Sequence, residues 1–344
     1  MARSLRRRVS NIPSGTYRGV NLTGLENGET VFPGTLNVDY TKNSLSYYSY
    51  IARKGFNIVR LPILWERIQP TVGGDLDADY KGYIDENITW AEASGLKIVL
   101  DVHNYGRRDV SGTERIIGSA QLTQAHFVDL WTKLSTAYKD NETVLVYDLM
   151  NEPHNMTVET SPTTYKTTAT WTLAAQAAID AIRANGDTHI ISVATDWWSS
   201  LPNFLAAFAY GGSPDVWWND PLNKIWLQIH TYLDSDYSGA YSGADRYWSG
   251  SGLDIRWAGD LLETIGKWAE SKGVTIFMGE YAIPSGDSAY TTALNDFMNV
   301  MDKYNVHGCY FAMGNFFNTS LKSITPKLGF AVDREQMEII TKYL

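Results

Sequence analysis

This 344-residue sequence has only one cysteine, no long apolar runs and no excess of basic residues. The single cysteine, Cys309, excludes an internal disulfide and lies in an apolar run, where we expect a small buried side chain. No run of about 18 uninterrupted apolar residues occurs, so the sequence predicts no membrane-spanning helix. The formal charge of -9 argues against nucleic acid or an anionic membrane as a partner, and a neutral substrate fits better.

The glycine-rich phosphate-binding motifs of open α/β sheets, G-x-G-x-x-G and G-x-x-x-x-G-K-[ST], are also lacking. The first residues, from Met1 to Val9, are basic, but no apolar core follows them, so they are not a recognisable signal peptide. We therefore expect residues 1–15 to form a basic N-terminal tail and residues 16–344 to form a single domain.

Aromatic residues, by contrast, are abundant, with 12 Trp and 21 Tyr in the chain. Several lie outside the periodic segments, including Trp197-Trp198, Trp217-Trp218, Tyr237 and Tyr241. Because aromatic rings stack on the apolar faces of sugar rings, exposed aromatics on loops suggest a sugar-binding cleft. For any single residue, ordinary packing of a loop is the alternative.

Short apolar segments of strand length alternate with amphipathic helical segments along the chain. Strands are expected at residues 17–21, 56–61, 96–103, 144–150, 189–193, 225–230, 275–279 and 306–311. Helices are expected around 45–52, 83–91, 127–138, 171–182, 257–268, 294–304 and 334–344. Eight strands spaced by roughly 40 residues, with a poorly periodic segment in place of a helix before residue 225, fit an α/β fold of the (β/α)₈ TIM barrel type. A doubly wound open sheet is the competing architecture.

Two glutamates follow strands directly. The strand from Val144 runs into Asn151-Glu152-Pro153, and proline ends the ladder because it has no N–H to donate. The strand at 275–279 runs into Glu280. Since the carboxyl ends of barrel strands meet at one face, these side chains should converge with the polar and aromatic residues at the other strand ends. Those residues are Asn21, Arg60, His103, Asn104, Asp196, Trp197, His230, Tyr232, Tyr281 and Phe311.

Paired carboxylates across a sugar-binding cleft are the minimal apparatus for glycoside hydrolysis, with one carboxyl protonated and the other ionised. Taken alone, each glutamate could equally be a strand-end ion pair. His103 with Asp101 resembles a metal pair, but no third and fourth ligands are spaced to complete a zinc site. We therefore predict an enzyme that needs no metal and no cofactor.

Five segments together carry a resemblance: N-I-V-R-L-P-I-L-W, D-V-H-N-Y-G, D-L-M-N-E-P-H, H-T-Y-L-D-S-D and F-M-G-E-Y. They are similar to glycoside hydrolase family five, and most of all to its endo-β-1,4-glucanases, in the expected order from about Tyr17 to Phe317. The resemblance implies Glu152 as general acid/base and Glu280 as nucleophile. It implies a shell around the reacting sugar, made of Arg60, His103, Asn151, His230 and Tyr232. Among the other residues at strand ends, we also expect Asn104, Trp197 and Phe311 to bind substrate.

Phe311 departs from the family pattern, in which a tryptophan ordinarily ends the eighth strand and forms a platform under the reacting sugar; here the smaller phenyl ring takes that place. The resemblance implies a retaining, secreted enzyme that binds cellulose-type β-glucan and its oligosaccharides, and we expect a monomer. A related activity on mannan, xyloglucan or mixed-linkage glucan, or glycosyl transfer, is the nearest alternative. A non-catalytic carbohydrate-binding barrel and a metal-dependent barrel hydrolase are the rivals from other classes.

Overall fold

Eight parallel strands close into a barrel at the centre of the molecule. The computed structural model describes residues 15–156, 169–204, 216–242 and 255–344. Around the barrel the strands follow the order β1-β10-β9-β8-β7-β6-β3-β2, which confirms the predicted TIM barrel. Their bounds are β1 (Arg18–Thr23), β2 (Ile58–Ile63), β3 (Lys97–Val102), β6 (Val144–Asp148), β7 (Ile190–Ala194), β8 (Ile225–Tyr232), β9 (Thr275–Ala282) and β10 (His307–Gly314).

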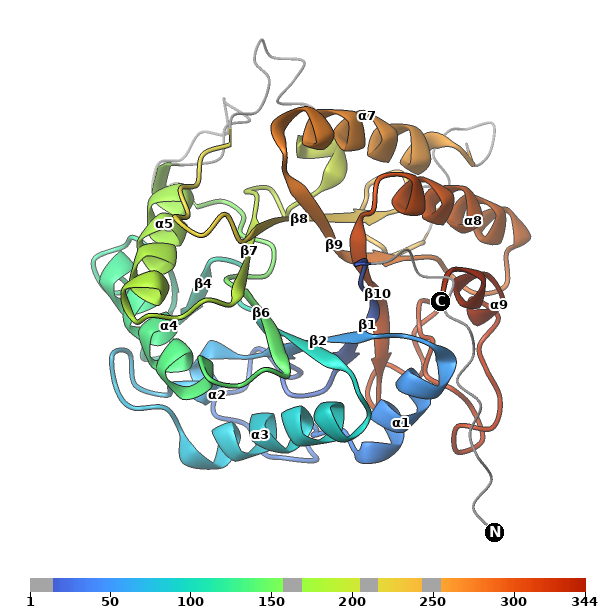
Figure 1. Cartoon of the computed structure of the whole chain (residues 1–344). Helices are drawn as coiled ribbons and strands as arrows, with labels where there is room; N and C mark the ends of the chain where they lie inside the picture. Colours follow the sequence, from blue (N-terminus) through green and yellow to red (C-terminus); the bar gives the residue numbers. More distant parts are fainter. Residues whose placement is uncertain (1–14, 157–168, 205–215, 243–254) are drawn as a thin grey trace.

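Helices surround the barrel as an outer ring, as Figure 1 shows in the view along the barrel axis. The described helices are α1 (Leu45–Lys54), α2 (Trp65–Ile68), α3 (Ala78–Ala93), α4 (Gln124–Tyr138), α5 (Ala169–Ala184), α7 (Trp257–Lys272), α8 (Ser288–Lys303) and α9 (Met337–Ile340). Local sequence sets several of their ends. Asp77 caps α3 by accepting a hydrogen bond from the backbone N–H of Tyr80, and Gly55 ends α1 in the left-handed conformation.

Apolar side chains fill the barrel interior, so it is a packed core. Most strand residues are buried, because helices cover the outer face and neighbouring strands face one another inside. A separate inner cluster contains Ile58, Val99, Val146, Trp226, Phe277 and Cys309. Cys309 is buried with no disulfide partner, as the sequence predicted.

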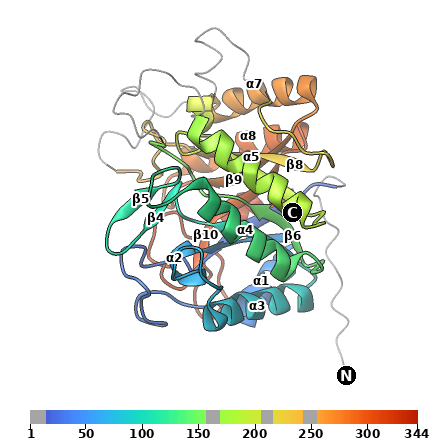
Figure 2. The same cartoon turned by 90° about the vertical axis from the view of Figure 1, so that its left-hand side faces the viewer.

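Two features differ from the sequence-based expectation. A hairpin of β4 (Arg107–Asp109) and β5 (Glu114–Ile116) follows β3, and its three-residue strands are too short for a period-2 pattern to reveal. Figure 2 shows this hairpin at one end of the barrel. The last helix is shorter than the predicted 334–344: α9 is followed only by a 3₁₀ turn at Thr341–Tyr343.

Tertiary hydrogen bonds explain the late start of α9. The guanidinium of Arg334 donates to the carbonyl of Thr325 at 2.8 Å, and the buried Gln336 amide donates to the carbonyl of Leu321 at 2.9 Å. These bonds hold residues 334–336 outside the helix.

Residues 1–14 of the predicted basic tail lie outside the described residues, so the proposed boundary at residue 15 stays a prediction. Among the described residues, no helix combines the length and the apolar character needed to cross a lipid bilayer.

Candidate active site

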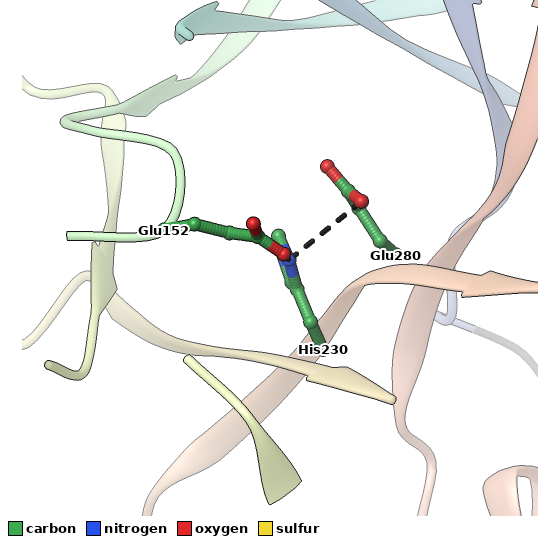
Figure 3. A group of neighbouring side chains, drawn as sticks. All are labelled: Glu152, His230 and Glu280. Carbon is green, nitrogen blue, oxygen red and sulfur yellow. Dashed lines mark hydrogen bonds and ion pairs between the residues drawn. The ribbon is translucent and has the colours of Figure 1, made fainter. Parts of the chain in front are cut away.

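The two glutamates singled out in the sequence face each other at the carboxyl end of the barrel (Figure 3). Glu152 lies just after β6, and Glu280 lies in β9. One oxygen of each carboxylate and one ring nitrogen of His230, from β8, all lie within 4.8 Å of one another. Residues that are 128 positions apart in the sequence therefore share one site, because parallel strands end at the same face.

Irregular strand pairing helps to aim the side chains of this site. The register between β8 and β9 shifts between Ile229 and His230, so that His230 pairs with Glu280. A further shift occurs between β9 and β10, at Gly308 to Tyr310. Register shifts at a barrel rim redirect neighbouring side chains, and here they lie next to the carboxylates.

Glu280 is held as an anion by its hydrogen-bond donors. Arg60 Nη1 lies 3.0 Å from Glu280 Oε1, and the Tyr232 hydroxyl donates to Glu280 Oε2 at 2.6 Å. Burial alone would raise the pKa of Glu280, but the positive field of His230 and Arg60, together with the Tyr232 hydrogen bond, outweighs it and lowers the pKa to about 2. Glu280 is therefore ionised at neutral and at mildly acidic pH.

Glu152 is placed differently. Its carboxylate pairs with His230, whose Nδ1 lies 2.7 Å from Glu152 Oε1. Burial raises the pKa of Glu152, and the negative charge of Glu280 raises it further. The side chain of Glu152 is 16% exposed against 4% for Glu280, so the carboxyl that tends to keep its proton is also the more accessible one. Its backbone φ of 42° is unusual for a residue with a side chain.

Arg60 is surrounded by three carboxylates. Its guanidinium lies 3.1 Å from Asp101, 2.8 Å from Asp148 and 3.0 Å from Glu280, and both Arg60 and the two aspartates are fully buried. Burial raises the pKa of Asp148 to about 7, against the opposing effect of Arg60. Sequence reasoning did not identify Asp148. A charged residue inside the apolar strand V-L-V-Y-D was the signal that could have revealed it.

His103 and Asn151 are oriented by this same buried group. His103 Nδ1 lies 2.6 Å from Asp101 Oδ2, and Asn151 accepts a hydrogen bond from Arg60 at 2.9 Å. The Asn151 amide therefore turns its nitrogen toward His103 Nε2, at 3.1 Å. Asp101 raises the pKa of His103 to about 9 despite burial. However, the Asn151 N–H can donate to His103 Nε2 only if that nitrogen carries no proton. The orientation of the Asn151 amide therefore favours neutral His103 with its proton on Nδ1.

The remaining predicted shell residues lie at the rim. Asn104 is buried and already bonded, since it accepts from the Trp65 backbone N–H and donates to Glu66, both at 2.7 Å. Trp197 lies after β7, half-buried, with a φ of 62°. Phe311, on β10, is half-buried and packs edge-on against Tyr232, with 6.4 Å between ring centroids.

Some loop aromatics are exposed to solvent, and others are packed within the fold. Trp198 is 38% exposed and stacks on His154, with 4.4 Å between ring centroids, beside the segment that carries Glu152. Tyr241 is buried instead, and its hydroxyl donates to the carbonyl of Ala282 at 2.6 Å. Tyr237 stacks on Trp257. For Tyr241 the packing alternative therefore holds, because its polar and apolar parts are both used within the fold.

Comparisons with known proteins identify the family of this chain. A sequence profile of the family "Cellulase (glycosyl hydrolase family 5)" matches residues 15–317. The chain is 26% identical to Endo-beta-1,4-glucanase A of Emericella nidulans, over 95% of this chain and 92% of that protein. It is 32% identical to Manganese dependent endoglucanase Eg5A of Phanerodontia chrysosporium, but that match spans 57% of this chain and 48% of the relative's length.

Solved structures match over nearly the whole barrel. XacCel5A, solved in complex with cellopentaose, superposes with a TM-score of 0.82 at 30% identity, covering 96% of this chain and 99% of the other. Pseudomonas stutzeri endoglucanase Cel5A, solved with cellobiose, gives a TM-score of 0.83 at 28% identity, with coverage of 95% and 92%. With the family profile running from Gly15 to Phe317 over a barrel of the same architecture, this chain belongs to glycosyl hydrolase family 5, the cellulase family, and is a glycoside hydrolase.

Proposed function

We propose that this enzyme hydrolyses internal bonds of β-1,4-glucan with retention of configuration. The observation that carries the proposal is the pair formed by Glu152 and Glu280, two close carboxyls whose surroundings push their pKa values in opposite directions. Retaining enzymes place their carboxyl groups about 5–5.5 Å apart, whereas inverting enzymes leave about 6.5–9.5 Å for a water molecule. One oxygen of Glu152 lies within 4.8 Å of one oxygen of Glu280, and so close an approach of the two carboxyl groups supports retention.

The first step uses the two carboxyls in different roles. The Glu280 carboxylate, aimed by Arg60 and Tyr232, attacks the anomeric carbon and forms a covalent glycosyl-enzyme. Glu152 gives its proton to the leaving glycosidic oxygen, and the nearby His230 keeps the carboxyl oriented. Asn151 has one amide N–H left for the sugar 2-hydroxyl, a contact that strengthens as the oxocarbenium-like transition state forms.

The second step returns the enzyme to its starting state. Glu152, now ionised, takes a proton from a water molecule, and that water attacks the anomeric carbon and releases Glu280. A sugar hydroxyl entering in place of water would give glycosyl transfer. Chromatography of products from cellulose, mannan, xyloglucan and mixed-linkage glucan tests the proposal, which requires cello-oligosaccharides from β-1,4-glucan as the fastest-formed products.

The names of the relatives support β-1,4-glucan as the substrate and oligosaccharides as ligands. We extend the proposal to an extracellular enzyme acting as a monomer, since an insoluble or very large polymer must be met outside the cell. Mass photometry of the purified chain checks the monomer, and secretion of the full-length native protein by its source checks the location.

The pH dependence of kcat/KM should be bell-shaped and wide. Activity should rise as Glu280 loses its proton, which occurs near pH 2 because its pKa is lowered to about 2. Activity should fall on the alkaline side as Glu152 loses its proton, at a pH above the usual 4.5 because its pKa is raised. Initial rates on a soluble cello-oligosaccharide across the pH range measure both limbs.

Two variants test which group sets the alkaline limb. Glu152→Ala, assayed in the pre-steady-state burst with an aryl glycoside whose leaving group needs no proton, should lose that limb. Glu26→Gln is the matched control, because burial raises the pKa of the nearby Glu26 to about 7 without placing it in the reaction. An alkaline limb that disappears with Glu26→Gln would contradict the assignment to Glu152.

A chelator should leave the activity unchanged. Glu152, His230 and Glu280 form the one group, among the described residues, that is spaced to hold a metal ion, and a bound cation would occupy both carboxylates that the reaction needs. Dialysis against EDTA followed by rate measurements checks this expectation. The name of one relative, Manganese dependent endoglucanase Eg5A, makes Mn²⁺ the cation to add back. Activity lost to EDTA and restored by Mn²⁺ would exclude the metal-free mechanism.

A further inference from the structure

Lys322 lies beside the tyrosine that supports the nucleophile. Its ammonium is 4.6 Å from the centre of the Tyr232 ring and 5.6 Å from the centre of the Phe311 ring. Tyr232 is the residue that donates to Glu280 at 2.6 Å, so one ring separates the lysine from the nucleophile. Within the part of the chain that the structure describes, no hydrogen bond or ion pair engages the ammonium.

The backbone holds this lysine over the barrel mouth. The carbonyl of Leu321 accepts hydrogen bonds from the Ser285 N–H and from the Gln336 side chain, both at 2.9 Å. On the other side, the Ile324 N–H donates to the carbonyl of Ala312 at 3.0 Å, next to Phe311. Lys322 is thus anchored to the segments that follow β9 and to β10, and its position does not depend on a free loop.

A glycine, Gly239, lies next to the Lys322 ammonium and leaves room for it. Gly239 has a φ of 70°, and a Cβ at this position would lie 2.9 Å from Lys322 Nζ and 2.6 Å from Tyr232 Cδ1. Any larger residue would press on both side chains. The loop that carries Gly239 is itself folded onto Asp234, which accepts from the Gly239 and Tyr241 backbone N–H groups at 3.0 Å. Lysine, tyrosine and glycine therefore form one packed corner.

An ammonium in a half-buried aromatic corner still needs acceptors for its three N–H groups. Burial lowers the pKa of Lys322, while Glu280, Asp234 and Glu152 oppose that effect through their negative charge. Those carboxylates already have closer donors, so a neutral oxygen is the better partner. Sugar hydroxyl oxygens are neutral acceptors, and Phe311 is the ring on which a sugar is expected to rest.

We propose that Lys322 binds a hydroxyl group of the glucose unit that rests on Phe311, and so positions the substrate on the nucleophile side of the cleft. This inference rests on the proposed function. The contact would compensate for the smaller stacking area of Phe311. An indole in place of the phenyl ring would compete with Lys322 for the same space beside Tyr232.

The test compares three variants on cellotriose and cellotetraose. Lys322→Met keeps the length of the side chain but removes its charge and donors, and should lower kcat/KM by roughly ten- to a hundredfold, mostly through KM. Lys322→Arg keeps the charge and donors and should retain more activity. Lys327→Met removes an exposed lysine from the same segment and should match the wild type.

Binding measured without turnover separates this inference from the proposed function. In an E280Q background, calorimetry should show a similar loss of affinity for cellotetraose when Lys322→Met is added. Monodeoxy cellotriosides, each lacking one hydroxyl, identify the hydroxyl that Lys322 binds. The analogue without that hydroxyl should bind more weakly than cellotriose to the protein that has Lys322. The same analogue should bind as well as cellotriose to the Lys322→Met protein.

Equal affinities of the Lys322 and Lys322→Met proteins for every ligand would overturn the proposal. A shift of the pH limbs in Lys322→Met with unchanged affinity would also overturn it, because Lys322 would then tune the pKa values of the carboxylates. A Lys322→Arg variant as impaired as Lys322→Met would overturn it as well. A wild type that turns over no β-glucan would instead contradict the proposed function, and the binding comparison would still decide the role of Lys322.

Discussion

Replacing Glu280 with glutamine is expected to abolish turnover while leaving oligosaccharide binding intact. The amide is similar in size to the carboxylate but has no negative charge with which to attack the anomeric carbon, so kcat should fall by a factor on the order of 10⁴ or more. The loss should be the same for good and poor leaving groups. Stopped assays on aryl cellobiosides measure the rates, and calorimetry with cellotetraose measures the binding.

Glu152→Ala is the counterpart that distinguishes the two roles. It should retain a fast glycosylation step with an activated aryl glycoside, because that leaving group needs no proton. Azide should then accelerate turnover by intercepting the glycosyl-enzyme, and it should give a glycosyl azide with the configuration of the substrate. An azide product of inverted configuration from the Glu152 variant would mean that the two glutamates have exchanged roles.

Arg60→Met is expected to damage stability and catalysis together. Methionine fills part of the same volume but leaves Asp101, Asp148 and Glu280 buried without their shared cation. Removing one partner of a buried ion pair costs about 3–5 kcal/mol, which corresponds to a fall in Tm of roughly 5–10 °C. The pKa of Glu280 should rise because the positive charge of Arg60 is gone, so the acid limb of the pH profile should move upward and kcat/KM should fall by about 100-fold or more.

Arg18→Met is the matched control for this experiment. Arg18 is also buried and paired, with Asp302 at 2.6 Å, but it begins β1 and so lies at the opposite end of the barrel from the carboxylates. It should lower Tm and leave the pH limbs in place. If Arg60→Met behaved like Arg18→Met, the pKa of Glu280 would not depend on Arg60. Calorimetric scans and rate–pH profiles of both variants decide the matter.

The alternation of strand and helix is a local property, and the sequence alone was enough to predict it. Hydrophobic periodicity located the eight barrel strands to within a few residues, because a buried strand must be apolar along its own length. The same strands placed Glu152 and Glu280 at one face, since parallel strands in a closed barrel end together. The fold class and the pair of carboxylates could therefore be predicted from the order of residues along the chain, and the family from the resemblance that five motifs carry.

The partners of each side chain are long-range, and only the tertiary structure decided them. Arg60 meets Glu280 across 220 positions in the sequence and Asp148 across 88. Lys322 was an ordinary loop residue until the fold placed it over Tyr232, and Tyr241 was a candidate sugar-binding residue until its hydroxyl proved to be bonded to Ala282. The start of α9 was likewise fixed by contacts between distant residues. A periodic pattern records which side of a segment is buried. The charges and hydrogen-bond donors that face a buried group, however, come from other segments. Those charges and donors set the pKa values on which the reaction depends.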